Sequence, residues 1–142
     1  MNPDTKQVVV VPCSGIGKSL GSVTREAAYE LCDTLRPRDT RLVALSKLVL
    51  GDAEARERVL TGPTVTIDGC KQMCAAKLVK HNGGAVAREV AAFDVFRNHK
   101  DLKPEGIAEL NQPGLQLARV IAADISEDLD AILAQGQGGT HA

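Results

Sequence analysis

Short runs of β-branched residues alternate with segments of helical periodicity along this chain, and this alternation predicts an α/β fold. The β-branched runs cover residues 6–12, 40–45, 63–68 and 85–90. The first run is apolar without alternation, which is typical of a strand buried on both faces of a parallel sheet. We therefore expect a mostly parallel sheet of about four strands, although the apolar residues at 47–50 obscure the end of the second strand.

Between these runs, apolar residues recur at the helical period. The expected helices cover residues 22–35, 52–60, 70–81, 94–98, 104–110 and 113–134. Asp68 occupies the N-cap position of the helix that begins at Cys70, and Asn82-Gly83-Gly84 ends that helix. We expect a single domain over residues 1–134, because the tail 135–142 is rich in Gly and Gln and predicts disorder.

Strands that alternate with helices indicate right-handed βαβ crossovers and a three-layer, Rossmann-like or flavodoxin-like domain. In such domains, ligands bind at the carboxyl ends of the strands, near the point where the strand order reverses. Cys13 follows the first predicted strand and Cys70 follows the third. We therefore expect both residues at the same edge of the sheet.

Composition and charge argue against nucleic acid as a partner. Aromatic residues make up only 2% of the chain, so it has few side chains on which bases could stack. The net charge of −1 gives no electrostatic attraction toward a polyphosphate. We expect the partners to be a metal ion and a small anion or sulfur-bearing ligand.

The polar N-terminal residues and the short apolar run Val8–Val11 do not match a signal peptide or a membrane span. We therefore expect a cytoplasmic protein without a membrane partner. Because the cytosol keeps thiols reduced, the four cysteines of this chain are better explained as ligands or reactive groups than as disulfides.

The segment Asp68-Gly-Cys70-Lys-Gln-Met-Cys74 is the strongest local signal in the sequence. On a helix, residues four apart share a face, and the first turns favour thiolates, so Cys70 and Cys74 are expected to converge on one soft cation. The alternative is a structural pair of small buried thiols.

Cys13 favours the metal interpretation, because it brings a third thiolate to the same edge of the sheet. Three thiolates and a fourth group make a tetrahedral zinc site. Asp68 and Cys32 are the candidates for the fourth ligand, and water or substrate is the alternative. Asp68 is equally well explained as a helix cap, and Cys32, near the far end of its helix, as a core thiol.

The glycine-bearing loop after the first strand suggests a small anion site. Ser14, Gly15, Gly17 and Lys18 could hold an anion at a helix N-terminus. The loop resembles the end of a P-loop, but Pro12 stands where a P-loop has a glycine and supplies no N–H, so nucleotide hydrolysis is not expected. The alternative is a glycine turn with a solvated lysine.

Several separated motifs resemble the DGC domain family over about residues 7–134. They are Pro12-Cys-Ser-Gly-Ile-Gly-Lys18, Arg25-Glu-Ala-Ala-Tyr29, Gly51-Asp-Ala-Glu-Ala-Arg56, Ile67-Asp-Gly-Cys70 with Cys74-Ala75, and Asp101-Leu-Lys-Pro104. The resemblance implies a zinc-binding domain with cysteine ligands and no established activity. It also implies a fourth cysteine near the end of the second strand, where this chain has Val43-Ala44-Leu45.

The sequence therefore predicts a zinc-binding domain with a thiolate site of Cys13, Cys70 and Cys74 at the carboxyl edge of a parallel sheet. One alternative is a thiol-redox enzyme or sulfur (persulfide) carrier that uses Cys13 with Cys70 or Cys74. Another is an iron–sulfur protein. Because no histidine lies in a motif, a hydrolase is not favoured, and whether the protein is an enzyme stays open.

Overall fold

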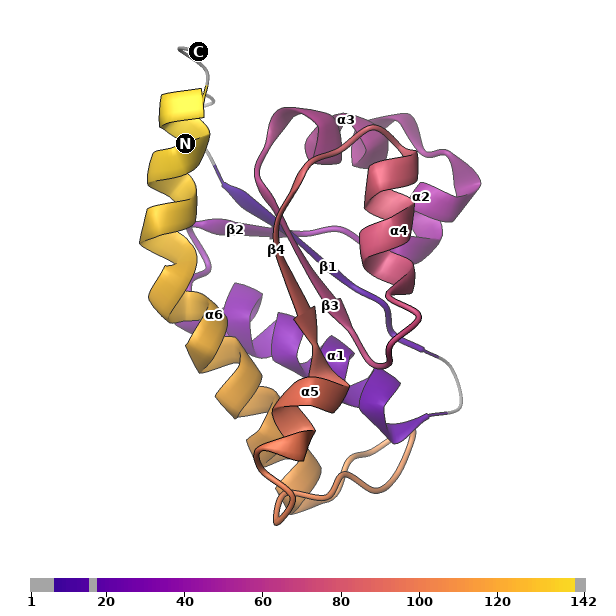
Figure 1. Ribbon diagram of the computed structural model, residues 1–142. Helices are drawn as coiled ribbons and strands as arrows, with labels where there is room; N and C mark the ends of the chain where they lie inside the picture. The colour runs from indigo at the N-terminus through magenta and orange to yellow at the C-terminus, as the bar shows by residue number, and fades with distance from the viewer. Residues whose placement is uncertain (1–6, 16–17, 140–142) are drawn as a thin grey trace.

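Four parallel strands form the centre of the molecule (Figure 1). The structure is a computed structural model that describes residues 7–15 and 18–139, with the backbone alone for 136–139. The strands are β1 (Val8–Pro12), β2 (Thr40–Leu42), β3 (Thr64–Asp68) and β4 (Val86–Ala91). They lie in the order β2-β1-β3-β4, and every pair is parallel, as the sequence predicts.

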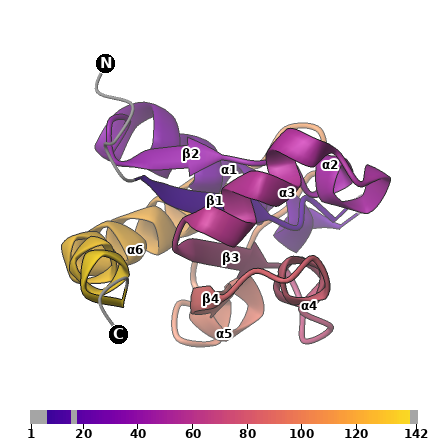
Figure 2. The same cartoon turned by 90° about the horizontal axis from the view of Figure 1, so that it is seen from above.

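Helices cover both faces of this sheet and complete a three-layer α/β fold. They are α1 (Ser19–Tyr29), which continues as the π-helix η1 (Glu30–Leu35), then α2 (Leu45–Leu50), α3 (Ala53–Thr61), α4 (Cys74–His81), α5 (Ala92–Arg97) and α6 (Gln112–Gly139). Figure 2 shows α6 on one side of the sheet and α3 and α4 on the other.

The alternation of β1 side chains divides the core into two halves. Val8 and Val10 pack in one cluster with residues of α1 and α6, whereas Val9 and Val11 pack in a second cluster with residues of α2, α3 and α4. All four valines are at most 3% exposed. The unalternating apolar run therefore forms a strand buried on both faces, as expected.

The strand order reverses at β1, because β2 lies on one side of it and β3 on the other. At this point, the connections leave opposite faces of the sheet and the carboxyl ends of β1 and β3 become accessible to a ligand. Cys13 and Gly69 are the first residues after these two strands.

One strand prediction and one helix prediction are wrong at the carboxyl side of the sheet. The second strand ends at Leu42 instead of Leu45. The residues at 47–50 that obscured its end belong to α2, which ends at Gly51 in the left-handed conformation (φ 75°). The expected helix at 104–110 is irregular, because Gly106 has a φ of 95° and the side chain of Asn111 bonds the N–H of Glu105 and the carbonyl of Lys103. These side-chain bonds replace the helical pattern.

Helix α6 is longer than the sequence predicts. It continues to Gly139, so residues 135–139, which were expected to be disordered, are helical. The buried Ile132 anchors its last turns, and an existing helix extends by one hydrogen bond per added residue. Residues 140–142 of the expected tail lie outside the described residues. Within the described part of the chain, no helix has the length and apolar character needed to cross a membrane.

Candidate functional site

Cys13 lies at the carboxyl edge of the sheet, directly after β1. Its N–H donates to the carbonyl oxygen of Ile67 (2.9 Å), which extends the pairing of β1 with β3. Its side chain is half-buried, and its Sγ accepts a hydrogen bond from the N–H of Gly69 at 3.2 Å. The structure therefore brings Cys13 against the turn that follows β3.

Thr24 of α1 fixes the turn after Cys13, and sequence reasoning missed it. Its fully buried hydroxyl donates to the carbonyl of Gly21 (2.7 Å) and accepts the N–H of Ser14 (3.1 Å). The same hydroxyl lies 3.7 Å from the sulfur of Cys13. Ser14 has a φ of 51°, so this bond holds a residue in a backbone region that serine seldom adopts. The sequence feature that could have identified Thr24 is its position as a polar residue on the apolar face of α1.

Two glycines allow three backbone segments to meet beside Cys13. A Cβ on Gly21 would overlap the carbonyl group of Gly15 and lie 2.7 Å from its carbon. A Cβ on Gly69 would lie 3.2 Å from the carbonyl carbon of Leu20. The first turn of α1 therefore packs closely between the loop after β1 and the turn after β3. Gly21 was not identified from the sequence as a residue of this site.

Asp68 is buried at the end of β3 and caps α4. Its carboxylate oxygens accept the N–H groups of Ala75 (2.7 Å) and Ala76 (3.2 Å), and it is 1% exposed. Burial raises the pKa of Asp68, while the two backbone hydrogen bonds oppose this shift. The carboxylate of Asp68 therefore binds amides of the first turn of α4, as a cap does. The expected N-cap position is wrong, because α4 begins farther along the chain and Met73 is its N-cap residue.

Cys70 and Cys74 do not share a helix, so the argument from helical spacing is wrong. Residues 69–72 form a turn, Met73 has a φ of 52°, and α4 begins only at Cys74. The physical reason is the cap: Asp68 binds the amides of the first turn that starts at Cys74. Cys70 is half-buried and Cys74 is exposed.

All three predicted cysteine ligands nevertheless line one cavity of about 1040 Å³ at this edge of the sheet. Cys13 comes from the end of β1, and Cys70 and Cys74 come from either end of the turn before α4. Asp68 lines the same cavity, as do Ala44 and Leu45 at the start of α2. The loops that carry the three thiols meet at the lower right of Figure 1.

The three sulfurs are not gathered into a coordination group. Within residues 7–15 and 18–139, no three Cys, His, Asp or Glu side chains lie close enough together to hold a metal ion. All four cysteines of the chain are free thiols. The donor set has the chemistry that zinc prefers, and the ligand assignment stays a prediction.

Cys32 lies apart from this cavity. It is half-buried in η1 and packs against the hydrophobic cluster formed by residues of α1 and α6. It is not among the described residues that line the cavity. Burial raises the pKa of its thiol. Its position corresponds to the core thiol that was the alternative explanation, and not to a ligand beside Cys13.

The residues of the predicted anion loop lie at the cavity, as far as the structure describes them. Ser14, Gly15 and Lys18 line it, and Gly17 lies outside the described residues. Lys18 is the N-cap of α1 and makes no side-chain hydrogen bond to the helix. Anion binding by this loop stays a prediction.

A family model for the DGC domain matches residues 9–112 of the chain. The match runs from the second residue of β1 to the first residue of α6 and includes Cys13, Asp68, Cys70 and Cys74. No curated protein and no solved structure matches the chain.

Proposed function

This chain belongs to the DGC domain family, and we propose that it binds zinc through the thiolates of Cys13, Cys70 and Cys74. The observation that carries the proposal is their meeting at one cavity from separate segments of the chain. Thiolates are among the preferred ligands of zinc, and three protein ligands leave one coordination position for water or another small ligand.

The arrangement supports an exchangeable site more than a closed structural one. Cys70 is half-buried and Cys74 exposed, so solvent and metal reach both thiols. They flank a short turn that contains the left-handed Met73. Because this turn belongs neither to β3 nor to α4, it can adjust when a metal binds without disrupting either element.

The residues around the three thiols also leave the fourth position open. Ala44 and Leu45, within the segment where the family resemblance implies a fourth cysteine, line the cavity and have no ligand atoms in their side chains. Both oxygens of Asp68 already accept backbone N–H groups. Water or a small ligand is therefore the fourth donor in this proposal.

Zinc binding is tested by metal analysis and by competition with a chromophoric zinc chelator. We expect about one zinc per chain, at least a tenfold loss of affinity in Cys13→Ser, Cys70→Ser and Cys74→Ser, and no loss in Cys32→Ser. The matched control is Cys32→Ser, because it removes a thiol that does not line the cavity. Equal effects of all four substitutions, or protein that takes up no zinc, would contradict the proposal.

A second candidate function is thiol chemistry at Cys13, and it is supported by the N–H of Gly69 directed at the sulfur. A backbone donor at this position stabilises negative charge on sulfur. In chelator-treated protein, mass spectrometry after brief alkylation would then find Cys13 modified before the more exposed Cys74. Modification in the order of exposure alone would argue against this candidate.

A further inference from the structure

The charged groups that line the cavity are mostly cations. Lys18 at the start of α1, Arg25 within α1 and Lys103 after α5 line it, and Asp68 is the only carboxylate in the described lining. The chain as a whole has a net charge of −1, so this is a local concentration of positive charge. These cations come from separate segments that the fold brings together around one space.

The positive charges of Lys18, Arg25 and Lys103 are not neutralised by Asp68 or by another carboxylate of the described residues. Asp68 is 1% exposed and accepts the N–H groups of Ala75 and Ala76. In the part of the chain that the structure describes, none of the three lining cations forms an ion pair with a carboxylate.

Arg25 is held in place without being neutralised. Its guanidinium donates to the carbonyl oxygen of Ile107 at 3.4 Å. The same carbonyl accepts the hydroxyl of Ser22, which ties the irregular loop before α6 to α1. A guanidinium has five N–H donors, so most of them remain available to an anion.

The remaining wall of the cavity is largely apolar. Its larger apolar side chains come from α1, α2, α5 and the loop after α5, and they are Leu20, Leu45, Val49, Phe96 and Pro104. Val49 is 67% exposed although it lines the cavity. A volume of about 1040 Å³ is at the upper end of the range for small-molecule sites.

We propose that this cavity binds a small organic anion, with its anionic group at Lys18, Arg25 and Lys103 and its apolar body against the wall that includes Val49. A purely inorganic anion would leave the apolar wall unused, and a neutral apolar molecule would leave the cations without a partner. The site does not depend on bound metal, so it stands apart from the proposed zinc function.

A matched set of ligands tests the two halves of this proposal by calorimetry on chelator-treated, full-length protein. Octanoate carries both the anion and the apolar body, octanamide keeps the body without the charge, and acetate keeps the charge without the body. We expect octanoate to bind at least about tenfold more tightly than either of the others, because one hydrogen-bonded charge contributes about that factor. Equal affinity for octanoate and octanamide would overturn the anionic half, and failure of octanoate to bind would overturn the whole.

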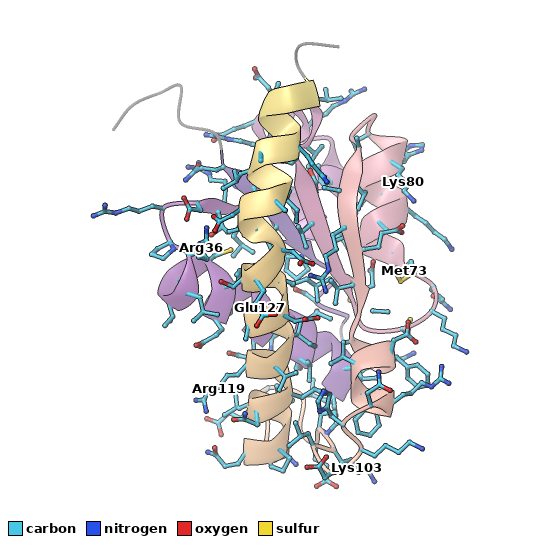
Figure 3. All side chains as sticks on the ribbon, turned by 60° about the vertical axis from the view of Figure 1, so that its left-hand side comes forward. Arg36, Met73, Lys80, Lys103, Arg119 and Glu127 are labelled. Carbon is cyan, nitrogen blue, oxygen red and sulfur yellow. The ribbon has the colours of Figure 1, made fainter. Side chains whose placement is uncertain are left out.

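Substitutions then locate the site on the molecule. Arg25→Gln is expected to weaken octanoate binding about tenfold, whereas Arg119→Gln, which removes the same charge from an exposed position on α6, leaves it unchanged. Figure 3 shows Arg119 projecting from α6 on the side away from Met73. If Arg25→Gln does not fold by circular dichroism, the exposed Lys18→Gln and Lys103→Gln replace it.

Two neighbours on α2 provide the control for the apolar wall. Val49 lines the cavity, whereas Leu50, which is 84% exposed, does not. Val49→Ser is expected to weaken octanoate binding several-fold and Leu50→Ser to leave it unchanged. Equal effects within either pair of variants would place octanoate elsewhere and contradict the proposal. Because all arms use metal-free protein, a failure to bind zinc does not alter their outcome.

Discussion

The Sγ of Cys13 accepts a hydrogen bond from the N–H of Gly69 at 3.2 Å, although 56 residues separate them in the sequence. Both residues directly follow neighbouring parallel strands, so the strand order brings them together. Gly69 also packs against the backbone of Leu20, where a Cβ would be 3.2 Å from the carbonyl carbon. The glycine therefore allows the turn to approach both the thiol and α1.

The close packing of Gly21 predicts a large cost for Gly21→Ala. The added methyl would overlap the carbonyl of Gly15, and both backbones are held by neighbouring elements. We expect the free energy of unfolding to fall by about 2–4 kcal/mol, measured by urea denaturation.

Gly15→Ala is the matched control for that substitution. Its Cβ would meet the Cα of Gly21 at 3.7 Å and the sulfur of Cys13 at 3.9 Å, which are ordinary contacts. We expect a change below about 1 kcal/mol. Similar losses in the two variants would show that the two glycines do not differ in packing as the structure describes.

Thr24→Val is expected to loosen the turn that carries Cys13. The substitution keeps the shape of the side chain but leaves the N–H of Ser14 and the carbonyl of Gly21 without this partner. We expect a loss of about 1–3 kcal/mol and faster alkylation of Cys13 in metal-free protein. Thr24→Ser keeps the hydroxyl and should retain the alkylation rate of the native protein, so equal rates in the two variants would contradict a role for this bond.

The sequence was sufficient to predict an α/β fold with a mostly parallel sheet of about four strands, because short β-branched runs alternate with segments of helical period. It did not predict the strand order β2-β1-β3-β4. The run from Val8 to Val11 forms a strand covered on both faces, and its end places Cys13 at the reversal of strand order. The position of Cys70 was predictable at the level of the sheet edge, since Cys70 lies two residues after β3.

Features that depend on contacts between distant segments were not predictable from local patterns. The start of α4 at Cys74 depends on the buried carboxylate of Asp68, which caps amides seven and eight residues later. The need for glycine at Gly21 appears only when the loop after β1 packs on α1. The segment at 104–110 follows the helical period but is held irregular by Asn111 and by the left-handed Gly106.

Cys32 gives a pH dependence whose sign follows from its burial. Because burial raises the pKa of this thiol, the unfolded chain ionises first as the pH rises. The contribution of Cys32 to stability is complete below the unfolded value of about 8.5 and is lost as the pH rises through the folded value. The free energy of unfolding should therefore fall more steeply above about pH 8.5 in the native protein than in Cys32→Ala.

Urea denaturation of the two proteins at a series of pH values measures this difference. Lysine and tyrosine side chains titrate in both proteins, so their contributions cancel in the comparison. Parallel curves up to about pH 10 would show that Cys32 is not protected by burial.

Ala44→Cys is expected to strengthen zinc binding, because it would restore a fourth thiolate at the cavity. Ala44 is exposed, lines the cavity beside the predicted ligands, and has extended backbone angles (φ −70°, ψ 133°) that cysteine adopts without strain. Exchange of a bound water for a thiolate should raise the affinity at least about tenfold in the chelator competition. Ala131→Cys, which adds an exposed thiol on α6, should leave the affinity unchanged. Equal gains in both variants would indicate that any added thiol binds zinc non-specifically. No gain in Ala44→Cys would mean that this position does not reach the metal that Cys13, Cys70 and Cys74 are proposed to hold.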